Sequence, residues 1–301
     1  MPDFGGVFSV LPTPFDRSGD IDLPSLQRVL DLFLAGGVNG FTALGVTGEV
    51  ARLTDGERDL VLDAVLSHVD GRVPVVAGTT AAGLRTCIEY TRRARSAGAA
   101  AVMISPPRMP KLNSDAVVAH YAGVAAAVDV PIIVQDYPPI SGYAMEPALL
   151  ARIAREVPAA RTIKLEDPPT PLKTSRILEQ TRDLDVRIFG GLGGVFLLEE
   201  LLAGAAGAMT GFAFPEILVA IVSRFRAGRV DEAADVFYRS VPLMRFEFQE
   251  GIGMAIRKEV LHRRGTITHP GIRPPGAVLD QTTREALDRV MAWVEAHGSG
   301  A

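Results

Sequence analysis

Short apolar segments alternate with longer amphipathic segments along the first 225 residues or so. Apolar runs of strand length begin near eight positions: Val7, Gly40, Val73, Ala100, Pro131, Arg161, Arg187 and Ala208. In the stretches between them, apolar residues recur with helical spacing, as over 23–34 and 57–69. A strand followed by a helix about every 30 residues predicts strand–helix units with parallel pairing.

Eight such units predict an α/β fold of one type, the closed (β/α)₈ or TIM barrel. A doubly wound open sheet is the competing fold, but it rarely uses eight regular units without a nucleotide fingerprint. We therefore expect a barrel domain over 1–228, followed by a helical module over 229–301. Its three helices are predicted at 231–248, 253–263 and 282–297, and the tail 298–301 is predicted to be disordered.

Helix boundaries can be predicted from local signals. Thr54 and Glu57 have the spacing of a capping box, in which the threonine caps the helix and the glutamate reaches back. Further helices are predicted at 84–96, 114–126, 147–157, 195–203 and 215–227. The helix over 84–96 contains Cys87, which we interpret as a small buried apolar residue.

Composition narrows the class of protein without identifying it. Hydrophobic residues make up 48% and charged residues 22%, as in an ordinary globular enzyme. The formal net charge of −4 gives no indication of a nucleic-acid partner or an anionic membrane. One cysteine, no evident signal peptide and no apolar run of membrane-spanning length together favour a cytoplasmic protein.

Lys164 is the first candidate for chemistry, because it lies near the end of the sixth apolar run. In a TIM barrel the carboxyl ends of the strands form the active-site rim. Apolar surroundings favour a neutral amine, which can attack a ketone to form a Schiff base. Lys164 therefore indicates a lyase acting on 2-keto acids, with a solvated charge at the strand end as the alternative.

The loop Gly45-Val46-Thr47-Gly48-Glu49 follows the second predicted strand. Two glycines allow a tight turn that exposes consecutive amides, and Thr47 adds a hydroxyl, so the loop can bind a carboxylate or a phosphate. The alternative is a plain turn between strand and helix, with Glu49 ordering the loop by accepting its amides.

Taken in order, this loop, Ile163-Lys164 and the Gly190-Gly191 pair resemble the dihydrodipicolinate synthase / N-acetylneuraminate lyase superfamily of class I aldolases. The resemblance extends from Leu11-Pro12-Thr13-Pro14-Phe15 through the helical C-terminus. It implies a TIM barrel with a C-terminal three-helix module, assembled as a homotetramer or homodimer. It also implies that Lys164 forms the Schiff base and that Thr47 and amides near Val46 hold the substrate carboxylate.

Three positions depart from that family's proton relay. Gln135 replaces a tyrosine on the fifth strand, Arg108 replaces a second tyrosine, and Val46 replaces a threonine. An amide does not titrate near neutral pH, so Gln135 can orient a group but cannot serve as an ordinary acid–base. Tyr137 is a possible substitute, although Pro138 is expected to bend the chain there. These changes argue against dihydrodipicolinate synthesis.

The segment Val134-Gln135-Asp136-Tyr137-Pro138 is more similar to 2-keto-3-deoxy-L-arabonate dehydratases. That resemblance implies dehydration of a 2-keto-3-deoxy sugar acid, with Gln135 positioning a substrate hydroxyl. Asp136, Glu166 or water would move protons, each carboxylate having a structural role as its alternative. The basic stretch 255–261 adds to the similarity, and we interpret it as a solvated or interface face of a helix.

Other interpretations remain open at this point. Gly190 and Gly191 offer backbone contacts to substrate hydroxyls or the substrate carboxylate, or simply allow tight helix–strand packing. Pyruvate-dependent aldol cleavage and synthase-like condensation are alternative reactions, and a catalytically silent keto-acid-binding barrel is the non-enzyme alternative. The five histidines show no metal-ligand spacing, which disfavours a metal-dependent aldolase. No external cofactor is expected, because the lysine imine is itself the electron sink.

Overall fold

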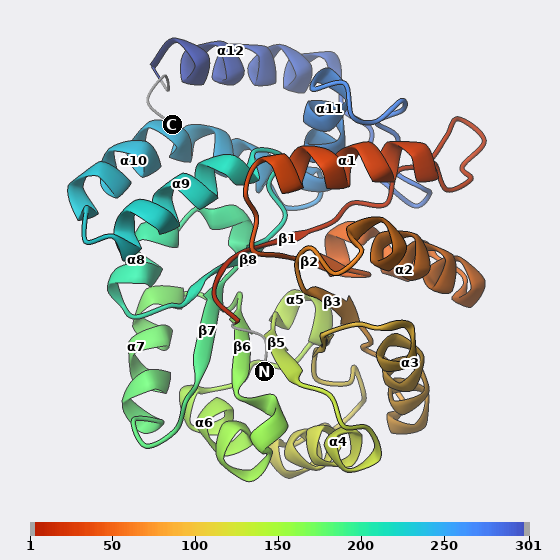
Figure 1. Ribbon diagram of the computed structural model, residues 1–301, viewed down its shortest axis with the longest axis vertical. Coiled ribbons are helices and arrows are strands. Elements are labelled where there is room, and N and C mark those ends of the chain that lie inside the picture. The colour runs from red at the N-terminus through yellow and green to blue at the C-terminus, as the bar shows by residue number, and fades with distance from the viewer. Residues whose placement is uncertain (1–3, 298–301) are drawn as a thin grey trace.

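The computed structural model describes residues 4–297 and contains a closed barrel of eight parallel strands, each paired with the next and β8 with β1. Figure 1 shows the helices arranged around this barrel. The strands are β1 (Gly6–Val10), β2 (Gly40–Ala43), β3 (Val75–Gly78), β4 (Ala101–Ile104), β5 (Ile132–Asp136), β6 (Thr162–Leu165), β7 (Arg187–Gly190) and β8 (Gly207–Thr210). The predicted TIM barrel is therefore confirmed, and each predicted strand start lies within two residues of the observed one.

Helices connect successive strands and then continue past the barrel. They are α1 (Leu23–Ala35), α2 (Asp55–Val69), α3 (Leu84–Ala97), α4 (Ser114–Ala127), α5 (Pro138–Ser141), α6 (Pro147–Glu156), α7 (Thr170–Gln180), α8 (Leu197–Leu202), α9 (Pro215–Arg226), α10 (Val230–Glu247), α11 (Gly253–Arg263) and α12 (Gln281–His297). Four short 3₁₀ turns are η1 (Val46–Gly48), η2 (Val50–Arg52), η3 (Pro158–Ala160) and η4 (Leu192–Gly194).

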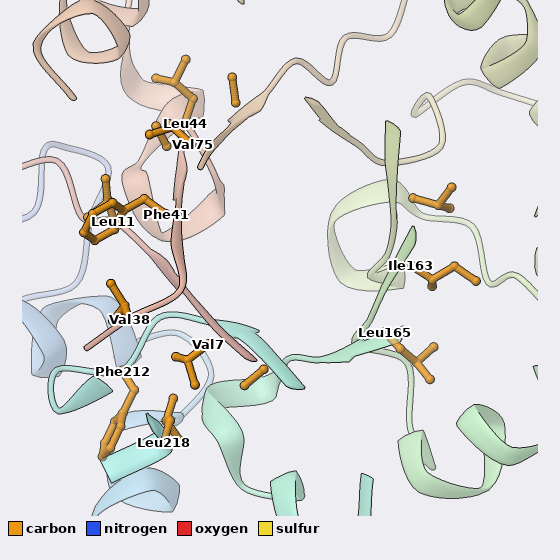
Figure 2. Close-up of a cluster of buried hydrophobic side chains, with 14 of the residues drawn as sticks. Val7, Leu11, Val38, Phe41, Leu44, Val75, Ile163, Leu165, Phe212 and Leu218 are labelled. Carbon is orange, nitrogen blue, oxygen red and sulfur yellow. The ribbon is translucent and has the colours of Figure 1, made fainter. Parts of the chain in front are cut away.

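Side chains of each strand alternate between the barrel interior and the helical layer. The interior is filled by a separate apolar cluster: Phe4, Phe8, Val10, Val76, Ala101, Met103, Ile133, Phe189 and Met209. The larger cluster lies between strands and helices, and Figure 2 shows part of it, including Ile163 and Leu165 of β6. Because Ile163 and Leu165 belong to the outer cluster, the residue between them faces inward.

Local signals in the sequence set several helix ends. The Thr54 hydroxyl accepts the Glu57 amide hydrogen, and the Glu57 carboxylate accepts the Thr54 amide hydrogen, so the predicted capping box is confirmed. Cys87 is fully buried, as predicted. Helix α7 and the single turn α5 were not predicted, because each begins beside prolines and α5 spans only Pro138–Ser141.

The three predicted C-terminal helices are present as α10, α11 and α12, on the side of the barrel where α9 and α1 lie (Figure 1). The interpretation of 255–261 as a solvated or interface face is wrong for this chain, because all seven residues are buried. The domain boundary at 228 and 229 stays a prediction, and the predicted disorder of 298–301 lies outside the described residues. Within residues 4–297, no helix is both long and apolar enough to cross a membrane.

Candidate active site

Lys164 faces the barrel interior near the carboxyl end of β6 and is only 4% exposed. On three even-numbered strands, two residues spaced two apart face the barrel interior at this end, because side chains alternate along a strand. They are Met103 and Ser105 at β4, Lys164 and Glu166 at β6, and Met209 and Gly211 at β8. The two methionines close the barrel beneath the lysine, while Ser105, Glu166 and Gly211 lie one step nearer the mouth.

Two hydrogen bonds and one ion pair link four side chains at the mouth and end at the lysine. The Ser105 hydroxyl donates to Gln135 Oε1 at 2.9 Å, and Gln135 Nε2 donates to Glu166 Oε2 at 2.8 Å. Lys164 Nζ lies 2.9 Å from the same Glu166 oxygen, and all four side chains are buried. The two sequence-predicted catalytic residues, Lys164 and Gln135, are therefore brought together by one shared carboxylate.

Glu166 was only one of three proposed proton carriers in the sequence, yet it is the carboxylate that reaches the lysine. Its spacing was the available signal, because residues two apart on a strand face the same side. Gly191 faces inward at the end of β7, and a Cβ there would lie 2.3 Å from Glu166 Cγ. A glycine at this position therefore leaves the space that the Glu166 side chain occupies.

Asp136 points the other way from Gln135, although the two are neighbours on β5. Its carboxylate is ion-paired with Lys173 of α7 at 2.5 Å, and Lys173 also contacts Asp167 at 2.7 Å. Burial raises the pKa of Asp136 to about 6 against the opposing effect of Lys173. The structure thus places Asp136 behind the barrel wall, outside the group around Lys164, because alternation along β5 turns it toward the helices.

The loop after β2 forms the 3₁₀ turn η1, with Leu44 and Glu49 in the left-handed backbone region. The Thr13 hydroxyl donates to the Gly48 carbonyl at 2.7 Å and fixes the turn against the segment after β1. Val46 and Thr47 are half-buried, and Thr47 Oγ1 has no hydrogen-bond partner among the described residues. Its hydroxyl thus remains available to a ligand.

Glu49 does order this loop, but not by accepting the loop amides as predicted. Its carboxylate is buried, is ion-paired with Lys258 of α11 and accepts the Arg273 amide hydrogen at 3.1 Å. Lys258 also donates to the Gly271 carbonyl at 3.0 Å. The prediction failed because these partners lie more than 200 residues away in sequence.

Two further predicted site residues follow β5 and β4. Tyr137 is half-buried, and burial raises its phenol pKa, with smaller contributions from the negative charges of Glu166 and Glu250. Tyr137 directly follows the carboxyl end of β5. Arg108 is exposed, and its side chain lies over Gly142 in the loop after β5, with Nε 3.9 Å from the position of an added Cβ.

Gly190 supports the packing alternative for the glycine pair. A Cβ at this position would lie 1.7 Å from Glu200 Oε2 on α8, so the glycine allows a buried carboxyl group to approach β7. The Thr170 hydroxyl donates to the other Glu200 oxygen at 2.5 Å. In residues 4–297 we find no grouping of three or more His, Cys, Asp or Glu suited to a metal ion.

Comparison with known proteins places this geometry in a family. A model of the dihydrodipicolinate synthetase family matches residues 3–294, which is nearly the whole chain. The chain belongs to this family. The crystal structure of the dihydrodipicolinate synthase from Rhodopseudomonas palustris superimposes with a TM-score of 0.92 at 34% identity, covering 97% of this chain and 98% of that one.

Relatives in this family carry two different activities. The chain is 34% identical to the L-2-keto-3-deoxyarabonate dehydratase of Azospirillum brasilense over 292 residues, covering 95% of this chain and 93% of that protein. It is 33% identical to the 4-hydroxy-tetrahydrodipicolinate synthase of Methanoculleus marisnigri, covering 96% and 98%. The chain is therefore a Schiff-base lyase of the dihydrodipicolinate synthetase family, and both named activities occur among similar proteins.

Proposed function

We propose that this enzyme dehydrates a 2-keto-3-deoxy sugar acid, with 2-keto-3-deoxy-L-arabonate as the favoured substrate. One observation supports the proposal above the others: Glu166 Oε2 contacts both Lys164 Nζ, at 2.9 Å, and Gln135 Nε2, at 2.8 Å. The Glu166 carboxyl group therefore contacts the lysine directly. The β5 residue that corresponds to the family's tyrosine is an amide, Gln135.

The first step is imine formation at C2 of the substrate. Glu166 accepts a proton from the Lys164 ammonium group, which leaves a neutral amine able to attack the ketone. The C2–N bond forms, and the C2 oxygen leaves as water with one proton from the amine and the proton held by Glu166. A protonated imine and the Glu166 carboxylate remain. The enclosed position of Lys164 below the mouth keeps the imine away from bulk solvent.

Elimination follows from the acidity of the protons on C3. A base removes one of them, and the electron pair forms an enamine that expels the C4 hydroxyl group. The departing oxygen takes a proton and leaves as water, and hydrolysis of the imine then releases the unsaturated keto acid and free Lys164. We assign both proton transfers to Glu166, since it lies beside the lysine, and assign to Gln135 the orientation of the hydroxyl.

Aldol cleavage is the second candidate, and Tyr137 is the observation that favours it. Cleavage needs a base on the C4 hydroxyl, and Tyr137 supplies a half-buried phenol directly after the carboxyl end of β5. Dehydration stands first because no base other than Glu166 is required, and because a dehydratase is among the similar proteins. A cytoplasmic location and a homo-oligomeric state stay predictions.

The test is borohydride trapping with pyruvate and, separately, with 2-keto-3-deoxy-L-arabonate, followed by peptide mass spectrometry. We expect a reduced adduct on Lys164 with both compounds. With the sugar acid, the mass of the adduct should be lower by one water than that of the adduct of the intact sugar acid. Release of pyruvate from the sugar acid would instead establish cleavage. An adduct on a different lysine would overturn the site assignment.

A further inference from the structure

Two buried polar atoms near the barrel mouth have no hydrogen-bond partner within residues 4–297: Thr47 Oγ1 and Arg257 Nη1. Arg257 lies on α11, and its side chain is only 7% exposed. A guanidinium group in such a place ordinarily uses its donors, because an unpaired buried donor costs free energy. Both atoms therefore indicate a missing acceptor.

Gly211 shows where these two atoms point. It follows Met209 on the inward face of β8, so a side chain here would project into the mouth, at the level of Glu166 and Ser105. A Cβ on Gly211 would lie 2.3 Å from Arg257 Nη1 and 3.1 Å from Thr47 Oγ1. The guanidinium group therefore occupies the space that an inward-facing side chain of β8 would fill.

The Nε side of the Arg257 guanidinium group is paired with a buried carboxylate, that of Glu247. Arg257 Nε lies 2.6 Å from Glu247 Oε1, and the Glu247 carboxylate also accepts the Ala213 amide hydrogen at 3.1 Å. Glu247 is itself 1% exposed, at the end of α10. This pairing orients Arg257 so that Nε faces the protein and Nη1 faces the mouth, a pre-organised arrangement for a second acceptor.

The family resemblance already assigns the substrate carboxylate to Thr47; we propose that Arg257 adds a charged donor to that site, over Gly211. The inference rests on the proposed function and extends it by assigning a charged donor from the C-terminal helices. A carboxylate accepts several hydrogen bonds at once, so one oxygen receives the Thr47 hydroxyl while the guanidinium group supplies charge. The subsite selects 2-keto acids over neutral ketones at the entrance to Lys164.

Oxamate tests the subsite without any chemistry at the lysine, because it carries the carboxylate of pyruvate but its amide carbonyl forms no imine. The variant is Arg257→Met combined with Glu247→Gln, which avoids leaving a buried carboxylate unpaired. Isothermal titration should give a dissociation constant about 10- to 100-fold higher than that of the wild type. An unchanged constant, or no binding of oxamate to the wild type, would overturn the proposal.

The matched control is Arg264→Met combined with Glu216→Gln. Arg264 lies seven positions further along the chain and is also paired with a glutamate, at 2.6 Å, but neither side chain reaches Gly211. The control should bind oxamate within about threefold of the wild type. Thermal unfolding of both double variants checks that each is folded before it is titrated.

Borohydride trapping with pyruvate and with hydroxyacetone, a ketone without a carboxylate, separates binding from folding. The Arg257 variant should lose trapping by pyruvate at limiting concentration and keep trapping by hydroxyacetone. An equal loss with both would show a purely structural role and overturn the proposal. Failure of the wild type to be trapped by either ketone would instead reject the proposed function, while the oxamate titration would still decide the role of Arg257.

Discussion

Two buried lysine–carboxylate pairs lie on opposite faces of the same barrel wall. Lys164 and Glu166 face the interior, whereas Lys173 pairs with Asp136 between the strands and α7. Lys164 is 4% exposed and Lys173 is 7% exposed, so burial does not distinguish them. The difference lies in their remaining contacts and in what each pair faces.

Lys173 is held by two carboxylates, Asp136 and Asp167, and packs against a helix. Lys164 contacts one carboxylate, and that carboxylate also accepts a hydrogen bond from an amide at the mouth. A lysine fixed by two charges in a closed layer stabilises the fold, whereas a lysine with one neighbouring acid can exchange a proton and meet a ligand. A charged pair in the core therefore indicates catalysis only where it faces an opening.

Exchange of each lysine for methionine should separate these roles most strongly. We expect Lys164→Met to lower turnover by about 10⁴-fold or more, because the variant lacks the amine to which we assign imine formation. Lys173→Met should keep turnover within about tenfold and lower the free energy of unfolding by about 3–5 kcal/mol, since it leaves Asp136 buried without its lysine. Steady-state kinetics and denaturant unfolding of both variants measure this, and a Lys164→Met enzyme with near-normal turnover would contradict the comparison.

Two adjacent acids directly after β6, Glu166 and Asp167, offer the next test. Glu166→Gln should lower kcat by about 10²- to 10⁴-fold, the usual effect of removing a general acid–base. The control is Asp167→Asn, which alters the adjacent carboxylate that faces Lys173 and should change kcat by less than about threefold. Equal losses in the two variants would show that the effect comes from local charge and not from contact with Lys164.

Glu200 sharpens the comparison, because it is a buried carboxyl group with no lysine or arginine paired to it among the described residues. Burial raises its pKa to about 7, with Thr170 acting against this and Glu199 adding to it. The folded state therefore binds a proton more tightly than the unfolded state between about pH 4.5 and 7. Stability contributed by the neutral group is present below this range and is lost as the pH rises through 7.

Glu200→Gln removes that titration. Relative to the variant, the wild type should lose about 3 kcal/mol of unfolding free energy between pH 5 and pH 8. Urea unfolding of both proteins at pH 5, 6, 7 and 8 measures the difference. A constant difference across this range would mean that Glu200 keeps one protonation state.

The barrel could be predicted from the sequence because the alternation of apolar and amphipathic segments is a local pattern. The strand starts needed no information from distant residues. Lys164 was singled out by its place near the end of a predicted strand, whereas Gln135 was singled out by the family resemblance, and the catalytic roles of both stay predictions. The helix start at Thr54 could be predicted in the same way, because its capping partner Glu57 lies three residues away. In each case the relevant partners lie within a few residues, or the alternation of the strand sets the direction of the side chain.

Contacts between distant segments could not be predicted from the sequence. Nothing local indicates that Glu49 pairs with Lys258, or that Arg257 reaches Gly211, because packing of α11 on the barrel brings them together. The basic stretch was interpreted as solvated for the same reason: charge alone does not show that Glu49 and Glu247 lie opposite it. Asp136 was named among the candidate proton carriers with a structural role as its alternative, and strict alternation from Gln135 places it on the outer face, where it pairs with Lys173.

The pairing of Glu49 with Lys258 and Arg273 has a consequence for how the chain matures during synthesis. The turn at Thr47 is fixed by residues that leave the ribosome more than 200 positions later. Nascent chains that have completed all eight strands still lack the groups that complete the mouth. A chain that ends before Lys258 therefore lacks the Lys258 and Arg273 contacts that hold the Glu49 carboxylate beside this turn.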